Sequence, residues 1–235
     1  MSALELAGVR AVVFDAVGTL LRPQPKVAKA YCDVARRFGS RREEPEVQSR
    51  FLAAWQAEEA RDSQSNSLRT DEARERRRWQ TIVAAVFPEV GDQAALFAAL
   101  WDHFADAASW RQFADVEQTW LQLAARGLVL AVGSNFDRRL LGICQAIEPL
   151  AGCSHVYPSS LVGHRKPAIE FYRHVATALQ LPGESILMIG DDYENDFVAA
   201  RRSGWRALFL SRDRAVSDAA SIESLTELPR LLRDC

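Results

Sequence analysis

Apolar runs alternate with helical periodicities over most of the chain. Short, mainly apolar runs occupy residues 9–15, 128–135, 185–192 and 205–210. The first three of these runs end in small or polar residues, and all four have the length and composition of strands buried on both faces. Apolar positions repeat with helical spacing over 115–126, 138–147, 168–180 and 194–203. This alternation predicts an α/β protein with a Rossmann-like parallel sheet and helices on both of its faces.

A second pattern interrupts this alternation between residues 22 and 110. Helical spacing continues there without a strand-like run, over residues 24–39, 44–61, 71–87 and 92–106. Helices that follow one another after the first strand predict a separate helical unit inserted into the sheet domain. We therefore expect two domains. They are a core formed by residues 1–21 and 111–235, and a small all-helical cap formed by residues 22–110.

Composition and charge exclude several classes of partner. The chain of 235 residues has 29 Lys+Arg and 31 Asp+Glu, a formal net charge of −2. Nucleic-acid binding needs clustered positive charge, so no nucleic-acid partner is expected. The sequence has no apolar run near the roughly 18 residues of a membrane span, and charged residues interrupt its start where a signal peptide would be apolar. We expect a cytoplasmic protein without a membrane partner. The sequence predicts no particular oligomeric state.

The polar residues that end the predicted strands are the first candidates for chemistry. The carboxyl ends of parallel strands meet at one edge of a sheet, so Asp15, Ser134 and Asp191 are expected to converge. Asp15 precedes a glycine-containing turn whose amides can face an anion, which suits a nucleophile. Ser134 and Asn135 offer neutral donors to a phosphoryl oxygen. Taken singly, Asp15 fits a turn cap and Ser134 fits a helix N-cap equally well.

A rare lysine and an acidic segment add charged groups to this set. The chain has three lysines among its 29 basic residues, and Lys166 is the only one after residue 29. Lys166 suits the neutralisation of negative charge at a site, and a solvated surface lysine is the ordinary alternative. The segment GDDYEND (190–196) groups carboxylates as Mg²⁺ sites do, although an acidic helix N-terminus has the same composition.

Taken in order, these residues resemble the motifs of the haloacid dehalogenase superfamily of aspartate-nucleophile hydrolases. The similar segments are VVFDAVGTL (12–20), Ser134, Lys166-Pro167, and Gly190-Asp191 through Asp196. The helical insert resembles the small cap of the first subfamily, and SNFDRRL (134–140) is similar to the rhythmically expressed and haloacid dehalogenase-like hydrolase-domain branch. The resemblance covers essentially the whole chain and implies a hydrolase acting on a small phosphorylated molecule.

The resemblance also assigns roles to single residues. It implies that Asp15 attacks to form an aspartyl intermediate, that Thr19 and Ser134 orient the phosphoryl group, and that Lys166 balances charge. Asn135 lies beside Ser134 as a further substrate-binding residue. The implied Mg²⁺ ligands are Asp15, the main-chain carbonyl of Val17, Asp191 and Asp196, with Asp192 as a further candidate.

One position departs from the superfamily's pattern. Its phosphatases carry a second Asp two residues after the nucleophile, where this chain has Val17. That Asp protonates the leaving oxygen and later activates water, and a valine side chain can do neither. The loss of a general acid/base typically costs about 10²–10⁴ in rate. The main-chain carbonyl at Val17 is retained, so the departure concerns proton transfer rather than metal binding.

Three hypotheses remain open at this stage. The acidic fourth motif favours a Mg²⁺-dependent phosphatase whose substrate has a good leaving group, such as an acyl phosphate. The second hypothesis is a metal-independent 2-haloacid dehalogenase, because the departure of halide needs no acid. Such dehalogenases place Ser and Asn where this chain has Asp191 and Tyr193, which argues against it. The third hypothesis is a protein that binds a phosphorylated ligand and does not hydrolyse it.

The predicted cap holds further residues of interest. The basic run at 74–78 is interpreted as the solvated face of a helix, with docking of a second anion as the alternative. The histidines show no metal-ligand spacing, and His164 is a candidate for the missing acid. Tryptophans in and beside the cap fit packing inside it better than the lining of a pocket, and they are Trp55, Trp79, Trp101 and Trp110.

Overall fold

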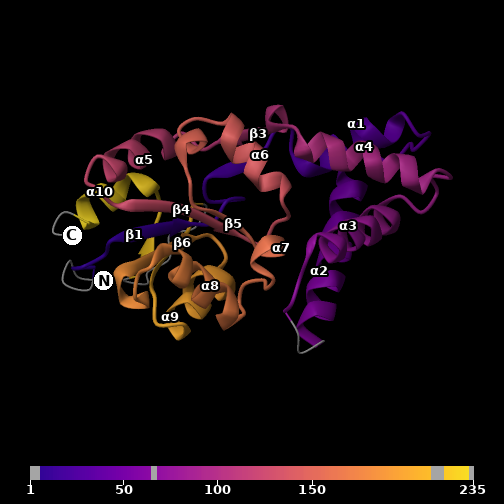
Figure 1. Ribbon diagram of the computed structural model, residues 1–235. Helices are drawn as coiled ribbons and strands as arrows, with labels where there is room; N and C mark the ends of the chain where they lie inside the picture. The colour runs from indigo at the N-terminus through magenta and orange to yellow at the C-terminus, as the bar shows by residue number, and fades with distance from the viewer. Residues whose placement is uncertain (1–5, 65–67, 213–219, 233–235) are drawn as a thin grey trace.

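Six parallel strands form a sheet in the order β5-β4-β1-β6-β7-β8 in the computed structural model, which describes residues 6–64, 68–212 and 220–232 (Figure 1). In chain order these strands are β1 (Ala11–Phe14), β4 (Val129–Ser134), β5 (Val156–Pro158), β6 (Ile186–Gly190), β7 (Arg206–Leu210) and β8 (Ser221–Ile222). The predicted Rossmann-like parallel sheet is confirmed. β1 lies at the centre, where Phe14 is in register with Val132 of β4 and Ile189 of β6.

Helices cover both faces of the sheet because alternate strand residues point to opposite sides. Val12 and Phe14 belong to one buried cluster, and Ala11 and Val13 belong to the other. The first face is covered by α5 (Val116–Ala124), α6 (Arg139–Ala146) and α10 (Leu228–Leu231). The second face is covered by α8 (Ile169–Leu179) and α9 (Ala199–Arg202), which follow the short helix α7 (Ser159–Val162). The central strands β1 and β6 are therefore buried at every position and carry no polar side chain, as the sequence pattern predicts.

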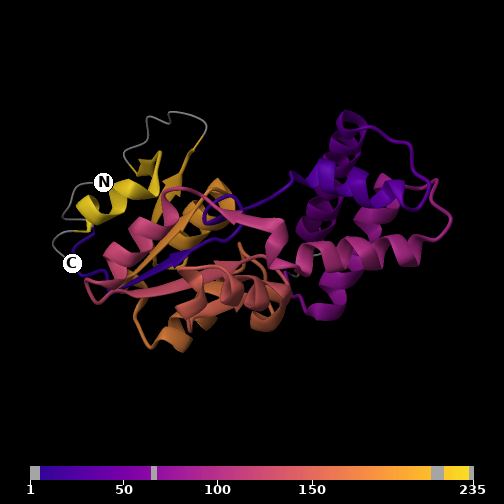
Figure 2. The ribbon, with the colours of Figure 1, turned by 90° about the horizontal axis from the view of Figure 1, so that it is seen from above.

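Four helices lie beside the sheet rather than on its faces (Figures 1 and 2). They are α1 (Val27–Arg36), α2 (Glu44–Gln64), α3 (Glu72–Val86) and α4 (Gln93–Ala105). Their inward residues, among them Tyr31, Ile82, Phe87 and Leu100, form a buried cluster of their own. We propose that residues 22–110 form the cap domain, because this third cluster is separate from the two clusters that flank the sheet.

A short antiparallel pair connects the two parts of the chain. β2 (Leu21–Pro23) pairs with β3 (Trp110–Gln112), so that Leu21 lies opposite Gln112 and Pro23 opposite Trp110. The pair lies where the chain leaves the core and where it returns. The sequence pattern did not predict it, because a three-residue strand has too few positions to show an alternation.

Two further differences from the predicted elements concern the carboxyl half. Residues 194–203 were expected to form one regular helix, whereas Tyr193–Val198 form a π-helical turn that continues into α9. Such turns occur frequently at functional sites. The short strands β5 and β8 were also missed.

Within the described residues, no helix has both the length and the apolar character needed to cross a bilayer.

Candidate active site

The candidate nucleophile lies at the middle of the carboxyl edge of the sheet. Asp15 follows β1 directly, Ser134 ends the neighbouring β4, and Asp191 follows β6 on the other side. The Asp15 main-chain N–H donates to the Ile189 carbonyl at 2.8 Å, which extends the ladder by one residue and fixes the start of the turn. The convergence expected from the sequence is therefore present in the structure.

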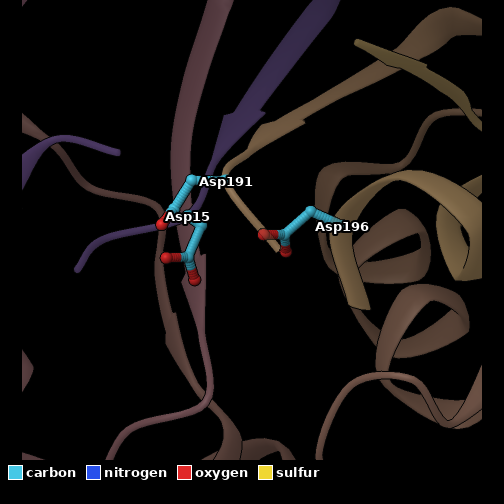
Figure 3. Close-up of side chains that lie close together, drawn as sticks. All are labelled: Asp15, Asp191 and Asp196. Atoms are coloured by element: carbon cyan, nitrogen blue, oxygen red, sulfur yellow. The ribbon is translucent and has the colours of Figure 1, made fainter. Parts of the chain in front are cut away.

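Three carboxylates share this edge. One oxygen of each of Asp15, Asp191 and Asp196 lies within 4.8 Å of the others (Figure 3). Asp15 and Asp196 are buried, whereas Asp191 is open to the cavity above. Figure 3 shows that Asp196 comes from a separate segment, the π-helical turn, and directs its carboxylate toward the other two.

Two glycines make this close approach of carboxylates possible. A Cβ atom at Gly18 would lie 2.1 Å from a carboxylate oxygen of Asp191, and a Cβ at Gly190 would lie 2.0 Å from one of Asp196. Gly18 also has a φ of +93°, a conformation that side-chain-bearing residues rarely adopt. Residues with side chains at these positions would therefore push the carboxylates away from the site.

Lys166 is the positive charge of the cluster. Its Nζ donates to Asp15 at 2.8 Å, to Asp196 at 2.5 Å and to the Gly133 carbonyl at 3.0 Å. The side chain is 2% exposed, so the interpretation as a solvated surface lysine is wrong. Burial alone would lower the pKa of Lys166, but Asp15 and Asp196 more than offset it, so the pKa is raised and the ammonium group keeps its charge.

Asn135 holds the main chain of this lysine. Its side-chain amide donates to the Lys166 carbonyl at 2.9 Å, and its side-chain oxygen accepts from the Lys166 N–H at 2.8 Å. Asn135 was expected to bind substrate. Since both ends of its amide contact Lys166, we propose instead that it positions the lysine loop.

The carboxylates repel one another despite this lysine. Although Asp191 is open to the cavity, desolvation by the surrounding protein, followed by the charge of Asp15, raises the pKa of Asp191 to about 6. Burial also raises the pKa of Asp196, against the opposing effect of Lys166. Three carboxylates and one ammonium group carry a formal charge of 1 − 3 = −2 when all are ionised. A divalent cation would neutralise that charge.

The donor set fits Mg²⁺. Mg²⁺ is bound by hard oxygen ligands, commonly one or two carboxylates together with water and substrate phosphate oxygens. Asp15 and Asp191 supply such oxygens at the cavity wall, whereas Asp196 is bound to Lys166 and only 1% exposed. We propose that Asp15, Asp191 and the main-chain carbonyl of Val17 would hold the ion, with Asp196 close behind them.

Thr19 and Ser134 differ in their position relative to the cavity. Thr19 has no exposed surface, and its hydroxyl donates to Asp191 at 2.8 Å. It was expected to orient the phosphoryl group, and because of this contact we propose that it positions Asp191. Ser134 is among the residues that line the cavity, is 3% exposed, and within the described chain its hydroxyl has no hydrogen-bond partner. It therefore stays a candidate for binding a phosphoryl oxygen.

A cavity of about 480 Å³ extends from Asp15 into the helices of the cap. That volume is in the usual range for small-molecule sites. Val17 lies in its wall and is 37% exposed, so the departure from the superfamily's pattern lies at the same cavity as Asp15. Asp192 also lines the wall, but its carboxylate caps the following turn by accepting from Asn195. His164, the candidate for the missing acid, is not among the residues that line this cavity. Its main chain pairs with that of Arg69.

The tryptophans line this cavity, which corrects the interpretation that they only pack inside the cap. Trp55, Trp79 and Trp101 are half-buried, and each contributes both to the cap cluster and to the cavity wall. Trp110 is almost completely buried at the same wall. Helical spacing identified the apolar face correctly but could not show that part of it borders an open space.

The basic run at 74–78 is likewise only partly solvated. Arg76 and Arg77 are exposed as expected. Arg78 is buried and forms ion pairs with Glu59 and Asp62, and Arg74 also pairs with Asp62 at 2.6 Å. The interpretation as one solvated face is therefore wrong for Arg78.

Arg165 connects this cap network to the core. Its guanidinium group contacts Glu75 at 3.0 Å and Glu59 at 3.0 Å, and Asp62 lies 3.7 Å away. Arg165 and Glu75 are both 3% exposed. Because Arg165 precedes Lys166 directly, the same loop holds the cap and the candidate catalytic lysine. Sequence reasoning missed this role, because nothing distinguishes Arg165 from the many other arginines.

Replacing Arg165 with Ala is expected to lower the free energy of unfolding by about 3–5 kcal/mol, because it leaves Glu75 buried without its charged partner. Urea denaturation measures this change. Arg77→Ala, at an exposed position of the same helix as Glu75, is the control and should stay within about 0.5 kcal/mol of the parent chain. Adding Glu75→Gln to Arg165→Ala should restore part of the loss. A loss below about 1 kcal/mol for Arg165→Ala would show that the network does not stabilise the fold.

Comparisons with known proteins bear on the family and the fold of this chain. A family model described as haloacid dehalogenase-like hydrolase matches residues 9–204. Haloacid dehalogenase-like hydrolase domain-containing protein 3 of Danio rerio is 28% identical over 96% of this chain and 97% of its own length. The L-2-haloacid dehalogenase of Xanthobacter autotrophicus is 18% identical, with a TM-score of 0.70 over 96% of this chain and 98% of that chain. A predicted phosphoglycolate phosphatase of Haemophilus somnus is 16% identical, with a TM-score of 0.69 over 96% and 99%.

Proposed function

Because this chain belongs to the haloacid dehalogenase-like hydrolases, we propose that it is a Mg²⁺-dependent phosphatase in which Asp15 attacks a small phosphorylated substrate. The observation that carries the proposal is the group of three carboxylates around Lys166, with its formal charge of −2. A phosphate substrate adds still more negative charge, so such a site needs a cation to bind it. Dehalogenases and phosphatases share this fold, and the donor set favours the phosphatase.

The residues of this chain divide the reaction between them. One oxygen of Asp15 attacks phosphorus, and the bond from phosphorus to the leaving oxygen breaks. Lys166, held charged between Asp15 and Asp196, donates to the Asp15 carboxylate and offsets the charge that accumulates on the phosphoryl oxygens. Ser134 donates to a phosphoryl oxygen from the cavity wall. Mg²⁺, when bound, supplies Lewis-acid stabilisation of the phosphoryl oxygens.

Water then completes the turnover. It attacks the phosphorus of the aspartyl phosphate, the bond to Asp15 breaks, and the water proton leaves with inorganic phosphate. In this chain neither step has a carboxyl group at position 17 to transfer the proton. The substrate's leaving oxygen must therefore depart without a proton from that position, which favours substrates with stable leaving anions.

Carbon–halogen hydrolysis is the second candidate, and Val17 is the observation that favours it. Halide leaves carbon without a proton, so a valine at that position would be neutral. The carboxylates oppose this function, because Asp191 and Asp196 face Asp15 and would repel a haloacid's own carboxylate unless a cation were bound.

We expect phosphate release from acetyl phosphate with Mg²⁺, and at least about a 100-fold fall in its rate with EDTA. Isothermal titration with MgCl₂ should show binding that Asp191→Asn weakens, which checks the metal without using activity. Chloride release from 2-chloropropionate is measured in parallel with EDTA present. Chloride release without phosphate release would overturn the phosphatase in favour of the dehalogenase, and release of neither product would favour a ligand-binding protein.

A further inference from the structure

Aromatic rings form most of the cap's share of the cavity wall. They include Phe51, Trp55, Trp79, Trp101 and Phe104. Trp55 contacts both Trp79, with ring centroids 5.6 Å apart, and Phe51, with centroids 6.3 Å apart. Trp55, Trp79 and Trp101 are half-buried, and all three belong to the cavity wall.

The charged groups on this part of the wall already have partners in the protein. The Arg139 guanidinium group forms two bonds of 2.7 Å to Asp137 and lies 3.5 Å above the centre of the Trp101 ring. Arg165 and Glu59 are paired with each other. A sugar or polyol in this space would lose its hydrogen bonds to water without gaining matching partners, which is costly. A planar apolar group would lose none.

The leaving-group requirement points to the same chemistry. An aliphatic alkoxide is a poor leaving group because its conjugate acid is about as weak an acid as water, and its pKa is far above that of a phenol. A phenol-type hydroxyl has a pKa of about 10, as tyrosine does, so its anion can leave without protonation. Val17, at the Asp15 end of the cavity, therefore excludes alkyl phosphates as good substrates more strongly than aryl phosphates.

We propose that the substrate is an aryl phosphate, a phosphate monoester of a phenol-type hydroxyl whose ring lies among the tryptophans of the cap. This inference rests on the proposed phosphatase function of the same site. Asp15 attacks phosphorus, the bond between phosphorus and the phenolic oxygen breaks, and a phenolate leaves and takes its proton from water. Hydrolysis of the aspartyl phosphate then returns Asp15 and inorganic phosphate.

The test compares substrates that share the phosphate and differ in the group that carries it. We expect kcat/KM for phenyl phosphate and 2-naphthyl phosphate, with Mg²⁺, to exceed that for glycerol 3-phosphate and glucose 6-phosphate by at least about 100-fold. Acetyl phosphate, which is small and has a good leaving group, reports on the phosphatase chemistry alone. Turnover of acetyl phosphate without a preference for aryl over polyol phosphates would overturn the substrate class and leave the phosphatase standing. Release of phosphate from none of them would overturn the phosphatase itself.

A ring-removing variant separates ring binding from leaving-group chemistry. Trp55→Leu should lower the ratio of kcat/KM for 2-naphthyl phosphate to kcat/KM for acetyl phosphate by about tenfold. Leu121→Ala, at an exposed position of α5 away from the cavity, is the control and should leave that ratio unchanged. Quenching of tryptophan fluorescence by 2-naphthyl phosphate in the Asp15→Asn protein gives the affinity without turnover, and Trp55→Leu should weaken it to a similar extent. An unchanged ratio and an unchanged affinity would show that the ring does not bind among the tryptophans.

Discussion

Asp15→Asn is expected to lower kcat for phosphate release from acetyl phosphate by a factor on the order of 10⁴ or more, because it removes the atom that forms the covalent bond. An amide oxygen is a far weaker nucleophile than a carboxylate oxygen. The same substitution takes one negative charge from the cluster and should also weaken Mg²⁺ binding in a calorimetric titration. Asp102→Asn makes the same chemical change on the exposed surface of α4 and should leave both measurements unaltered.

The covalent intermediate gives this prediction a second readout. Acid quenching of the wild-type protein during turnover of labelled acetyl phosphate should leave a hydroxylamine-labile label on Asp15, and the Asn variant should carry none. Loss of activity through unfolding can be distinguished, because Lys166 keeps Asp196 as a partner when Asp15 is neutralised. We therefore expect the free energy of unfolding in EDTA not to fall. Substantial turnover by the Asn variant would rule out Asp15 as the nucleophile.

The parallel sheet and its active edge were predictable because their signals are local. A buried strand such as β1 is apolar at every position, and the polar residue that ends it marks the edge where parallel strands meet. Asp15, Ser134 and Asp191 could therefore be placed together although 119 and 57 residues separate them in turn (134 − 15 and 191 − 134). No pairing between distant segments had to be known for this step.

The features that were missed depend on contacts between distant segments. Arg78 was assigned to a solvated face because the sequence of its own helix does not show its partners. They are Glu59 and Asp62, which belong to another helix. Arg165 joins that network from the core and carries no local signal. The contact of the Thr19 hydroxyl with Asp191, which lies 172 residues away in the sequence, likewise has no local signal.

The tryptophans show a different limit of sequence reasoning. Helical periodicity indicates which face of a helix is apolar, and this was correct for Trp55 and Trp79. It does not indicate whether the apolar face meets another helix or an open cavity. That distinction depends on how far the cap stands from the sheet, which only the folded arrangement determines.

Val17→Asp is expected to raise kcat/KM for glycerol 3-phosphate by about 10²–10⁴, because it supplies the general acid that an alkoxide leaving group needs. The position is 37% exposed and borders the cavity, so an introduced carboxyl group does not have to be buried. The gain for p-nitrophenyl phosphate should be much smaller, since its leaving group already departs without a proton. Steady-state rates with saturating Mg²⁺ measure both.

Val17→Asn separates proton transfer from the other consequences of this change. Its side chain has nearly the shape and polarity of Asp but cannot transfer a proton, so it should give no gain with either substrate. A gain with both variants would mean that polarity or space at position 17, rather than an acid, limits the rate. An equal gain in kcat for alkyl and aryl phosphates with Asp alone would place the limit at hydrolysis of the aspartyl phosphate, where the same carboxyl group acts as a base toward water. A gain confined to alkyl phosphates would show that departure of the leaving group limits the rate. Val17 would then restrict this phosphatase to substrates with stable leaving anions.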